Sequence, residues 1–181
     1  MSQKANLSKY PLPEALTGRV ISYLNIFRLI ISLGLLYAVF AGFVTSTQVL
    51  DMTVIAGTVL VTYSVMAIYL ALEARRRNSK PYLVAKISLF TDVLFLSILH
   101  FIFGGLESGI AVLLIFTSAS AAILLPIRLA LFVASLVVLV FMGESIVRIV
   151  YHGESLAALV PAALHGVTTF TITILVNLLS H

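Results

Sequence analysis

Cysteine is absent from this chain of 181 residues, and charged side chains make up only 10% of it. Without cysteine the chain has no disulfide, no thiolate metal site and no cysteine nucleophile. An average globular chain is about 25% charged and about 45–50% apolar, whereas this chain is 61% hydrophobic. Too few polar side chains are present to cover a water-soluble globule. The composition therefore excludes a soluble enzyme or binding module and indicates an integral membrane protein.

Apolar segments long enough to cross a bilayer recur along the chain. About 20 apolar residues span roughly 30 Å of hydrocarbon. Six spans are expected at approximately 24–44, 52–72, 83–103, 110–125, 129–150 and 156–179. An amphipathic approach from about Glu14 leads into the first span, and Pro126 favours a break after the short fourth span because it lacks a backbone donor. Backbone groups must be satisfied internally in lipid, so the fold is predicted to be all-α, a polytopic membrane bundle of six transmembrane helices.

The basic residues indicate the orientation of the bundle. Of the 11 lysines and arginines, only Arg148 falls near the loops that carry Asp51, Glu107 and Glu154. The expected topology anchors are Arg75, Arg76, Arg77 and Arg128. Cytoplasmic loops carry an excess of Lys and Arg, so both chain ends are predicted to be cytoplasmic. Residues 1–13 are then a cytoplasmic tail without a signal peptide, and residues 14–181 form the transmembrane domain.

The positive charge is also compatible with two kinds of partner. The net charge of +4 suggests nucleic acid, but the basic residues sit beside apolar runs, so membrane topology fits them better and no nucleic-acid partner is expected. The run from Arg75 to Arg77 could contact anionic lipid headgroups, since such charges are worth roughly 1 kcal/mol each near a membrane surface.

Asp92 lies about ten residues into the third predicted span, near mid-membrane depth. Ionisable groups at that depth are expensive, and each carries a functional hypothesis by default. One interpretation is a recognition or switching residue that faces the bundle interior. The other is a structural hydrogen-bonding or ion-pair partner that fixes helix packing. Lys86 is on a different helical face and is an unsuitable partner within that helix.

Glu144 and Arg148 stand four residues apart on the fifth predicted span, with the acid first. This order favours an ion pair along one face of a helix. The pair is either a packing device or a contact that shifts the helix when a partner binds. A glycine-rich outer turn, with Gly104, Gly105, Ser108 and Gly109, is the third candidate, because glycine permits positive φ and a sharp reversal.

The remaining polar and small residues point to packing rather than to a cofactor. The histidines give no pair at matched depth for haem and no zinc motif, so no cofactor or metal is expected. These are His100, His152, His165 and His181. Small residues at four-residue spacing allow close helix approach within the bundle or in a dimer. They are Ala38 and Gly42, Ala130 and Ala134, and Ala158, Ala162 and Gly166, while Asn177 is expected to hydrogen-bond across helices.

Several segments together resemble the N-terminal membrane region of PilS-type sensor histidine kinases. They read RVISYLNIFRLI at 19–30, TDVL at 91–94, GGLESGI at 104–110 and ILLPIRLAL at 123–131. The resemblance implies a sensor domain in the bacterial inner membrane, with pilin as its intramembrane ligand. It further implies that the sixth span feeds a PAS-like domain and a dimeric kinase core, which passes phosphate to a PilR-type response regulator.

The chain itself lacks the phosphoacceptor box, the asparagine box and the glycine-rich ATP lid of such kinases. It is therefore expected not to be an enzyme, but to be the membrane domain of a longer homodimeric protein. Two other functions remain open. A six-span chain of this size could be the substrate-binding subunit of a transporter, which would need a polar cavity. It could also be a scaffold subunit of a membrane complex.

Overall fold

The computed structural model describes residues 14–41, 50–76 and 80–180, and the described elements are all helices. In chain order they are α1 (Glu14–Phe40), α2 (Leu50–Arg75), α3 (Pro81–Ile102), the 3₁₀ helix η1 (Gly105–Ser108), α4 (Ile110–Leu124), α5 (Ile127–His152), the 3₁₀ helix η2 (Leu156–Ala158) and α6 (Leu159–Ser180). Five helical segments are long and apolar enough to cross a membrane, at 17–40, 53–74, 81–102, 127–152 and 156–180. α4 is apolar but shorter.

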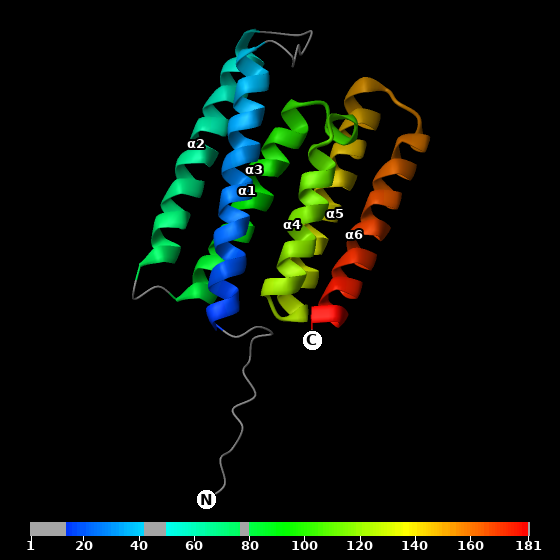
Figure 1. Ribbon diagram of the computed structural model, residues 1–181. Coiled ribbons are helices and arrows are strands. Elements are labelled where there is room, and N and C mark those ends of the chain that lie inside the picture. Colours follow the sequence, from blue (N-terminus) through cyan, green and yellow to red (C-terminus); the bar gives the residue numbers. More distant parts are fainter. Residues whose placement is uncertain (1–13, 42–49, 77–79, 181) are drawn as a thin grey trace, which may run out of the picture.

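The α-helices α1 to α6 stand side by side along one axis (Figure 1). α2 lies at one edge of the bundle and α6 at the other. α1 packs against α2 and α3, α4 packs against α5 and α6, and α3 joins the two halves through its contacts with α4 and α5. We call the end where α1 begins and α6 ends the termini end, and the end that carries η1 and η2 the turn end (Figure 1).

The helix boundaries agree with the predicted spans apart from the first. The expected approach from Glu14 and the first span form one continuous helix, which ends at Phe40, and the predicted end of the span at 44 lies outside the described residues. The predicted break at Pro126 is confirmed, because Leu125 is extended (φ −116°, ψ 153°) and Pro126 is the N-cap of α5. The predicted tail, residues 1–13, lies outside the described residues.

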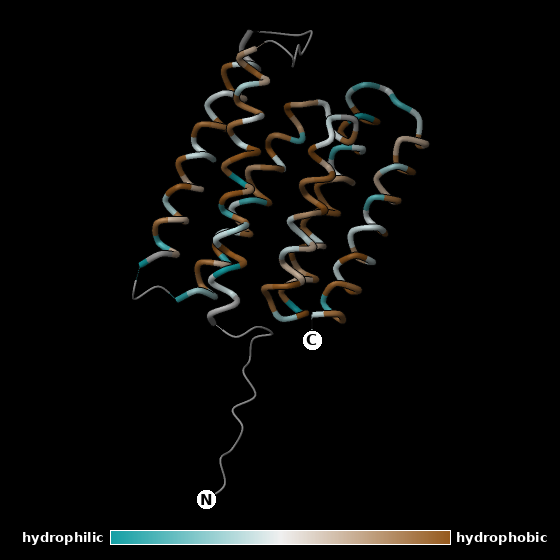
Figure 2. Tube along the Cα trace, in the orientation of Figure 1, coloured by the Kyte–Doolittle hydropathy of each residue, from teal (hydrophilic) through white to brown (hydrophobic). Residues whose placement is uncertain are grey.

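The bundle surface is largely apolar, and its interior combines large apolar side chains with several alanines. Hydrophobic residues cover most of the traced helices (Figure 2), and large apolar side chains such as Tyr37 and Leu178 are about 70% exposed. Ala130, Ala134 and Ala162 are fully buried. The predicted small-residue ridges on α5 and α6 therefore pack inside the bundle, whereas Gly42 lies outside the described residues.

Charge is distributed unequally between the two ends. The termini end carries the exposed side chains of Arg19, Arg76, Lys80 and Arg128. Arg76, just beyond the end of α2, contacts Glu73 of that helix at 2.9 Å. Arg75 and Arg77, the other two predicted anchors, cannot be compared in this way. The side chain of Arg75 and the whole of Arg77 lie outside the described residues. The basic end is thus the end where α1 begins and α6 ends, as the charge pattern predicted.

Candidate functional site

Arg28 of α1 and Asp92 of α3 form an ion pair inside the bundle. The Nη2 and Nε atoms of Arg28 lie 2.5 and 2.6 Å from Oδ2 of Asp92. Each residue is only 5% exposed. Arg28 lies 14 residues after the start of α1 and Asp92 lies 11 residues after the start of α3, and both helices begin at the termini end. The two side chains therefore meet at similar depth.

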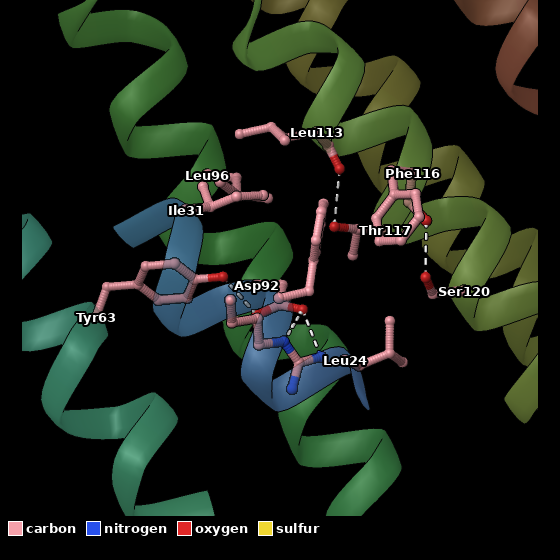
Figure 3. A pocket seen from close by; sticks show the side chains of 11 residues that line it. Leu24, Ile31, Tyr63, Asp92, Leu96, Leu113, Phe116, Thr117 and Ser120 are labelled. Carbon is pink, nitrogen blue, oxygen red and sulfur yellow. Dashed lines mark hydrogen bonds and ion pairs between the residues drawn. The ribbon is translucent and has the colours of Figure 1, made fainter. Parts of the chain in front are cut away.

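Three further side chains complete the hydrogen bonding of this pair. Tyr63 of α2 donates its hydroxyl to Oδ1 of Asp92 at 2.9 Å, and Figure 3 shows it pointing at the carboxylate. Nη1 of Arg28 donates to Oδ1 of Asn25 at 2.7 Å and to the hydroxyl of Ser88. We call these five residues the polar centre. Both carboxylate oxygens and all three guanidinium nitrogens are engaged, which is the condition under which a buried charge pair is tolerated.

The polar centre joins the first three helices. Arg28 and Asn25 come from α1, Tyr63 from α2, and Ser88 and Asp92 from α3. Ser88 and Asp92 are four residues apart, so they share one face of α3 and both meet the guanidinium. A charge left alone at this depth would cost roughly 2.5–3.5 kcal/mol on insertion scales. The contacts therefore fix the relative position of α1, α2 and α3.

A small cavity adjoins the polar centre on the side of α4. Arg28, Tyr63 and Asp92 line it together with apolar residues and with Thr117 and Ser120 of α4 (Figure 3). Its volume is about 20 Å³, which is room for about one water molecule. Two more of its lining residues, Phe27 of α1 and Phe116 of α4, bring their ring centroids to 4.6 Å. This contact bridges the two halves of the bundle beside the charges.

A second charged cluster lies at the turn end, on α5. The predicted ion pair is present, with Nε of Arg148 2.9 Å from Oε1 of Glu144. Glu154 approaches the same nitrogen at 3.8 Å from beyond the end of α5. Glu144 is 4% exposed. A Cβ added at Gly105 would overlap its carboxylate, so the turn lies directly against Glu144.

The turn itself depends on glycine and on one serine. Gly104, Gly105 and Gly109 have φ values of 90°, 71° and 73°, in the left-handed region that glycine adopts without strain. Ser108 donates its hydroxyl to the carbonyl of Gly105 at 2.6 Å and accepts from the amide of Ile110 at 3.3 Å. The predicted turn is confirmed, and it brings Gly105 to the ion pair on α5. The side chain of Glu107 lies outside the described residues.

Three rings line up beside this cluster. His100 of α3 is fully buried, and its ring centroid lies 5.5 Å from that of Phe141 on α5. Phe141 in turn contacts His165 of α6 at 5.7 Å. Neither ring nitrogen of His100 has a hydrogen-bond partner among the described residues. Within the described ranges no three His, Cys, Asp or Glu side chains converge to hold a metal.

α6 is tied to α4 by polar contacts. Thr173 and Ser118 share a hydrogen bond of 2.9 Å, and Nδ2 of Asn177 donates to the carbonyl of Ala122 at 2.8 Å. The expected cross-helix bond of Asn177 is thus present. On its other side α6 meets α5 closely, because a Cβ added at Gly166 would lie 3.2 Å from Val138.

Comparison with known protein families identifies the family of this chain. A model of the PilS-like transmembrane domain, a six-span family, matches residues 12–181. The chain belongs to this family. Searches of curated proteins and of solved structures gave no significant match. Together with the apolar helices, membership makes the chain a multi-pass membrane protein and indicates a membrane sensor domain of the PilS type.

In this PilS-like domain the candidate residues predicted from the sequence fall into two separate sites. Asp92 belongs to the polar centre. Glu144, Arg148 and the glycine turn meet at the turn end. The charge pattern of the sequence groups Arg28 with the cytoplasmic charges that orient the chain, and the structure corrects this assignment. Arg28 is 5% exposed and pairs with Asp92 in the interior.

Tyr63 and Asn25 of the polar centre were also missed by sequence reasoning. A usable signal was present, since Arg28 falls inside the predicted first span and Asp92 inside the predicted third. Two opposite charges within spans that start on the same side, at similar distances from that side, are candidates for pairing. Nothing comparable marks Tyr63, because an uncharged tyrosine within an apolar span does not require a partner of opposite charge.

Proposed function

We propose that this chain is the signal-input domain of a two-component sensor histidine kinase that controls type IV pilus expression. It would lie in the bacterial inner membrane with both ends in the cytoplasm. Membership of the PilS-like family supports this function. The single observation that carries it is the Arg28–Asp92 pair, because a buried charge pair often stabilises less than apolar packing would, and we infer that its role here is to specify one arrangement of α1 and α3.

The proposed ligand is pilin, which would pack an apolar helix on the bundle within the bilayer. The first and last helices, α1 and α6, offer the surface for this contact. Only 22% of the membrane-spanning windows of α1 and α6 is buried within the bundle, so most of each faces outward. Packing between helices in lipid relies on close fit, which such exposed apolar faces provide.

The proposed output runs through α6. This helix lies at the edge of the bundle and ends at the termini end (Figure 1). Thr173 and Asn177 bond it to α4, and in this proposal an exchange of these hydrogen bonds gives α6 two alternative arrangements. Pilin would shift the populations by binding one arrangement better than the other. A PAS-like domain and a homodimeric kinase core attached beyond α6 would pass the change to a PilR-type response regulator.

The cavity at the polar centre does not favour a transporter. Small-molecule sites occupy roughly 300–1,000 Å³, whereas this cavity is about 20 Å³. A site of that size accommodates water and no vitamin-sized substrate.

The proposal is tested with the full-length parent protein in nanodiscs, with and without co-reconstituted pilin. Autophosphorylation of the kinase core is the readout. We expect pilin to change the rate several-fold, an unrelated single-span peptide to leave it unchanged, and Asp92→Asn to abolish the response. Glu73→Gln, the same change at a partly exposed surface pair, should keep the response. Equal rates with pilin and with the unrelated peptide would refute pilin sensing.

A further inference from the structure

A hollow lies between α1 and α2 at the termini end of the bundle. Its volume is about 380 Å³. It exists because small residues face each other there, with Gly18 on α1 and Ala71 on α2. A Cβ added at Gly18 would meet nothing within 4 Å. The hollow shares Asn25 with the polar centre and contains none of the residues of the turn-end cluster.

The lining of the hollow changes from polar to apolar along α1. Arg19 and Ser22 lie nearest the helix start, Asn25 follows, and Ile26 and Leu29 lie deepest. From Gly18 to Leu29 the helix rises about 16 Å. A polar entrance at the membrane boundary above an apolar floor matches a molecule that has a polar head and apolar chains. A free anion would make no use of the apolar part.

The polar groups of the hollow are short of partners. Arg19 is exposed, and no acidic side chain among the described residues pairs with it. Asn25 is 2% exposed, and its Nδ2 group has no hydrogen-bond partner in the described part of the chain. Its amide oxygen accepts from Arg28. The hollow thus offers the positive charge of Arg19 and the hydroxyl of Ser22, which together suit a phosphate group.

We propose that this hollow binds one anionic phospholipid. The phosphate lies against Arg19 and Ser22, and the acyl chains begin along Ile26 and Leu29. Basic hollows between membrane helices on the cytoplasmic side are the kind of site that holds such headgroups. Because Asn25 also contacts Arg28, the bound lipid adjoins the polar centre. The site does not depend on pilin or on a kinase core.

The test uses the whole chain in detergent with an equimolar mixture of phosphatidylglycerol and phosphatidylcholine, and native mass spectrometry counts the retained lipids. We expect one phosphatidylglycerol to be retained in preference to phosphatidylcholine. Arg19→Gln should lower its retention by about fivefold or more, and Arg19→Lys should keep most of it. Arg128→Gln is the matched control, an exposed arginine at the same end but outside the hollow.

A second variant separates the hollow from its charge. Ala71→Leu keeps Arg19 but fills the space, and it should lower phosphatidylglycerol retention while leaving the helix content unchanged by circular dichroism. Equal losses in Arg19→Gln and Arg128→Gln would overturn the proposal in favour of nonspecific surface charge. Displacement of the lipid by inorganic phosphate would show a free-anion site instead. A change of oligomeric mass in Ala71→Leu, with lipid retention unchanged, would assign the hollow to a second copy of the chain.

Discussion

Gly105 and Glu144 are in direct contact across the turn end, although 39 residues separate them in the chain. The glycine comes from the turn between α3 and α4, and the carboxylate from α5. The carboxylate occupies the place where any other residue at position 105 would put a Cβ. The turn and the ion pair of α5 therefore form one structural unit, and movement of either requires adjustment of the other.

Replacement of Gly105 by alanine tests this contact. Gly105→Ala adds a Cβ that overlaps the carboxylate of Glu144, at a φ of 71°. Gly104→Ala imposes similar strain at a φ of 90° but meets nothing within 4 Å. We expect Gly104→Ala to cost about 1 kcal/mol and Gly105→Ala to cost at least about 2 kcal/mol more, as overpacking does. Unfolding by SDS in mixed micelles measures both.

The control is to measure the same two glycine variants in a protein that also carries Glu144→Ala. Removal of the carboxylate removes the overlap, so Gly105→Ala should cost no more there than Gly104→Ala does. An unchanged difference between the two glycine variants would mean that Glu144 is not what restricts position 105.

Tyr63 is expected to stabilise the polar centre through its hydroxyl alone. Tyr63→Phe removes the 2.9 Å hydrogen bond to Asp92 and leaves Oδ1 without this donor. Loss of a partner from a buried polar group costs about 1–3 kcal/mol. Tyr69→Phe is the matched control on the same helix, because Tyr69 is 55% exposed. If the two variants unfold at the same SDS concentration, Tyr63 makes no bond of consequence to Asp92.

Gly166 sets the spacing between α5 and α6. Gly166→Ala places a Cβ 3.2 Å from Val138, which is tighter than ordinary contact. In the Gly34→Ala variant of α1, where nothing lies within 4 Å, alanine should stabilise the helix by about 0.5–1 kcal/mol. We expect Gly166→Ala to show no such gain and, if the proposed function holds, to alter the basal autophosphorylation of the proposed full-length kinase. A gain equal to that of Gly34→Ala, with unchanged autophosphorylation, would show that this contact is neither tight nor part of the output.

Features that depend on neighbouring residues were predictable from the sequence. Pro126 ends α4 through its own backbone, and Glu144 and Arg148 lie on one face because they are four residues apart. The glycine turn follows from the freedom of its own φ angles.

Features that join distant segments were not predictable in the same way. Arg28 and Asp92 are 64 residues apart, and their pairing depends on how α1 packs against α3. Positive charge near the start of a span fits the topology pattern equally well, which is why the sequence alone places Arg28 among the orienting charges. The contact between Gly105 and Glu144 likewise depends on the placement of α5. The hydropathy of the sequence predicts which segments span the membrane, but it does not predict which of these helices pack against one another.

A double-mutant cycle on Arg28 and Asp92 measures the strength of the buried ion pair itself. Arg28→Gln and Asp92→Asn each leave one charge buried alone, and we expect each to lower the unfolding free energy by about 3–5 kcal/mol in SDS titration. The double variant buries no charge, so its loss of unfolding free energy should be smaller than the sum of the two single losses. The difference, which is the coupling energy of the pair, should be at least about 2 kcal/mol. Lys86→Gln on α3 controls for loss of a charge outside the pair. Additive losses, with a coupling energy near zero, would contradict an ion pair that holds α1 against α3.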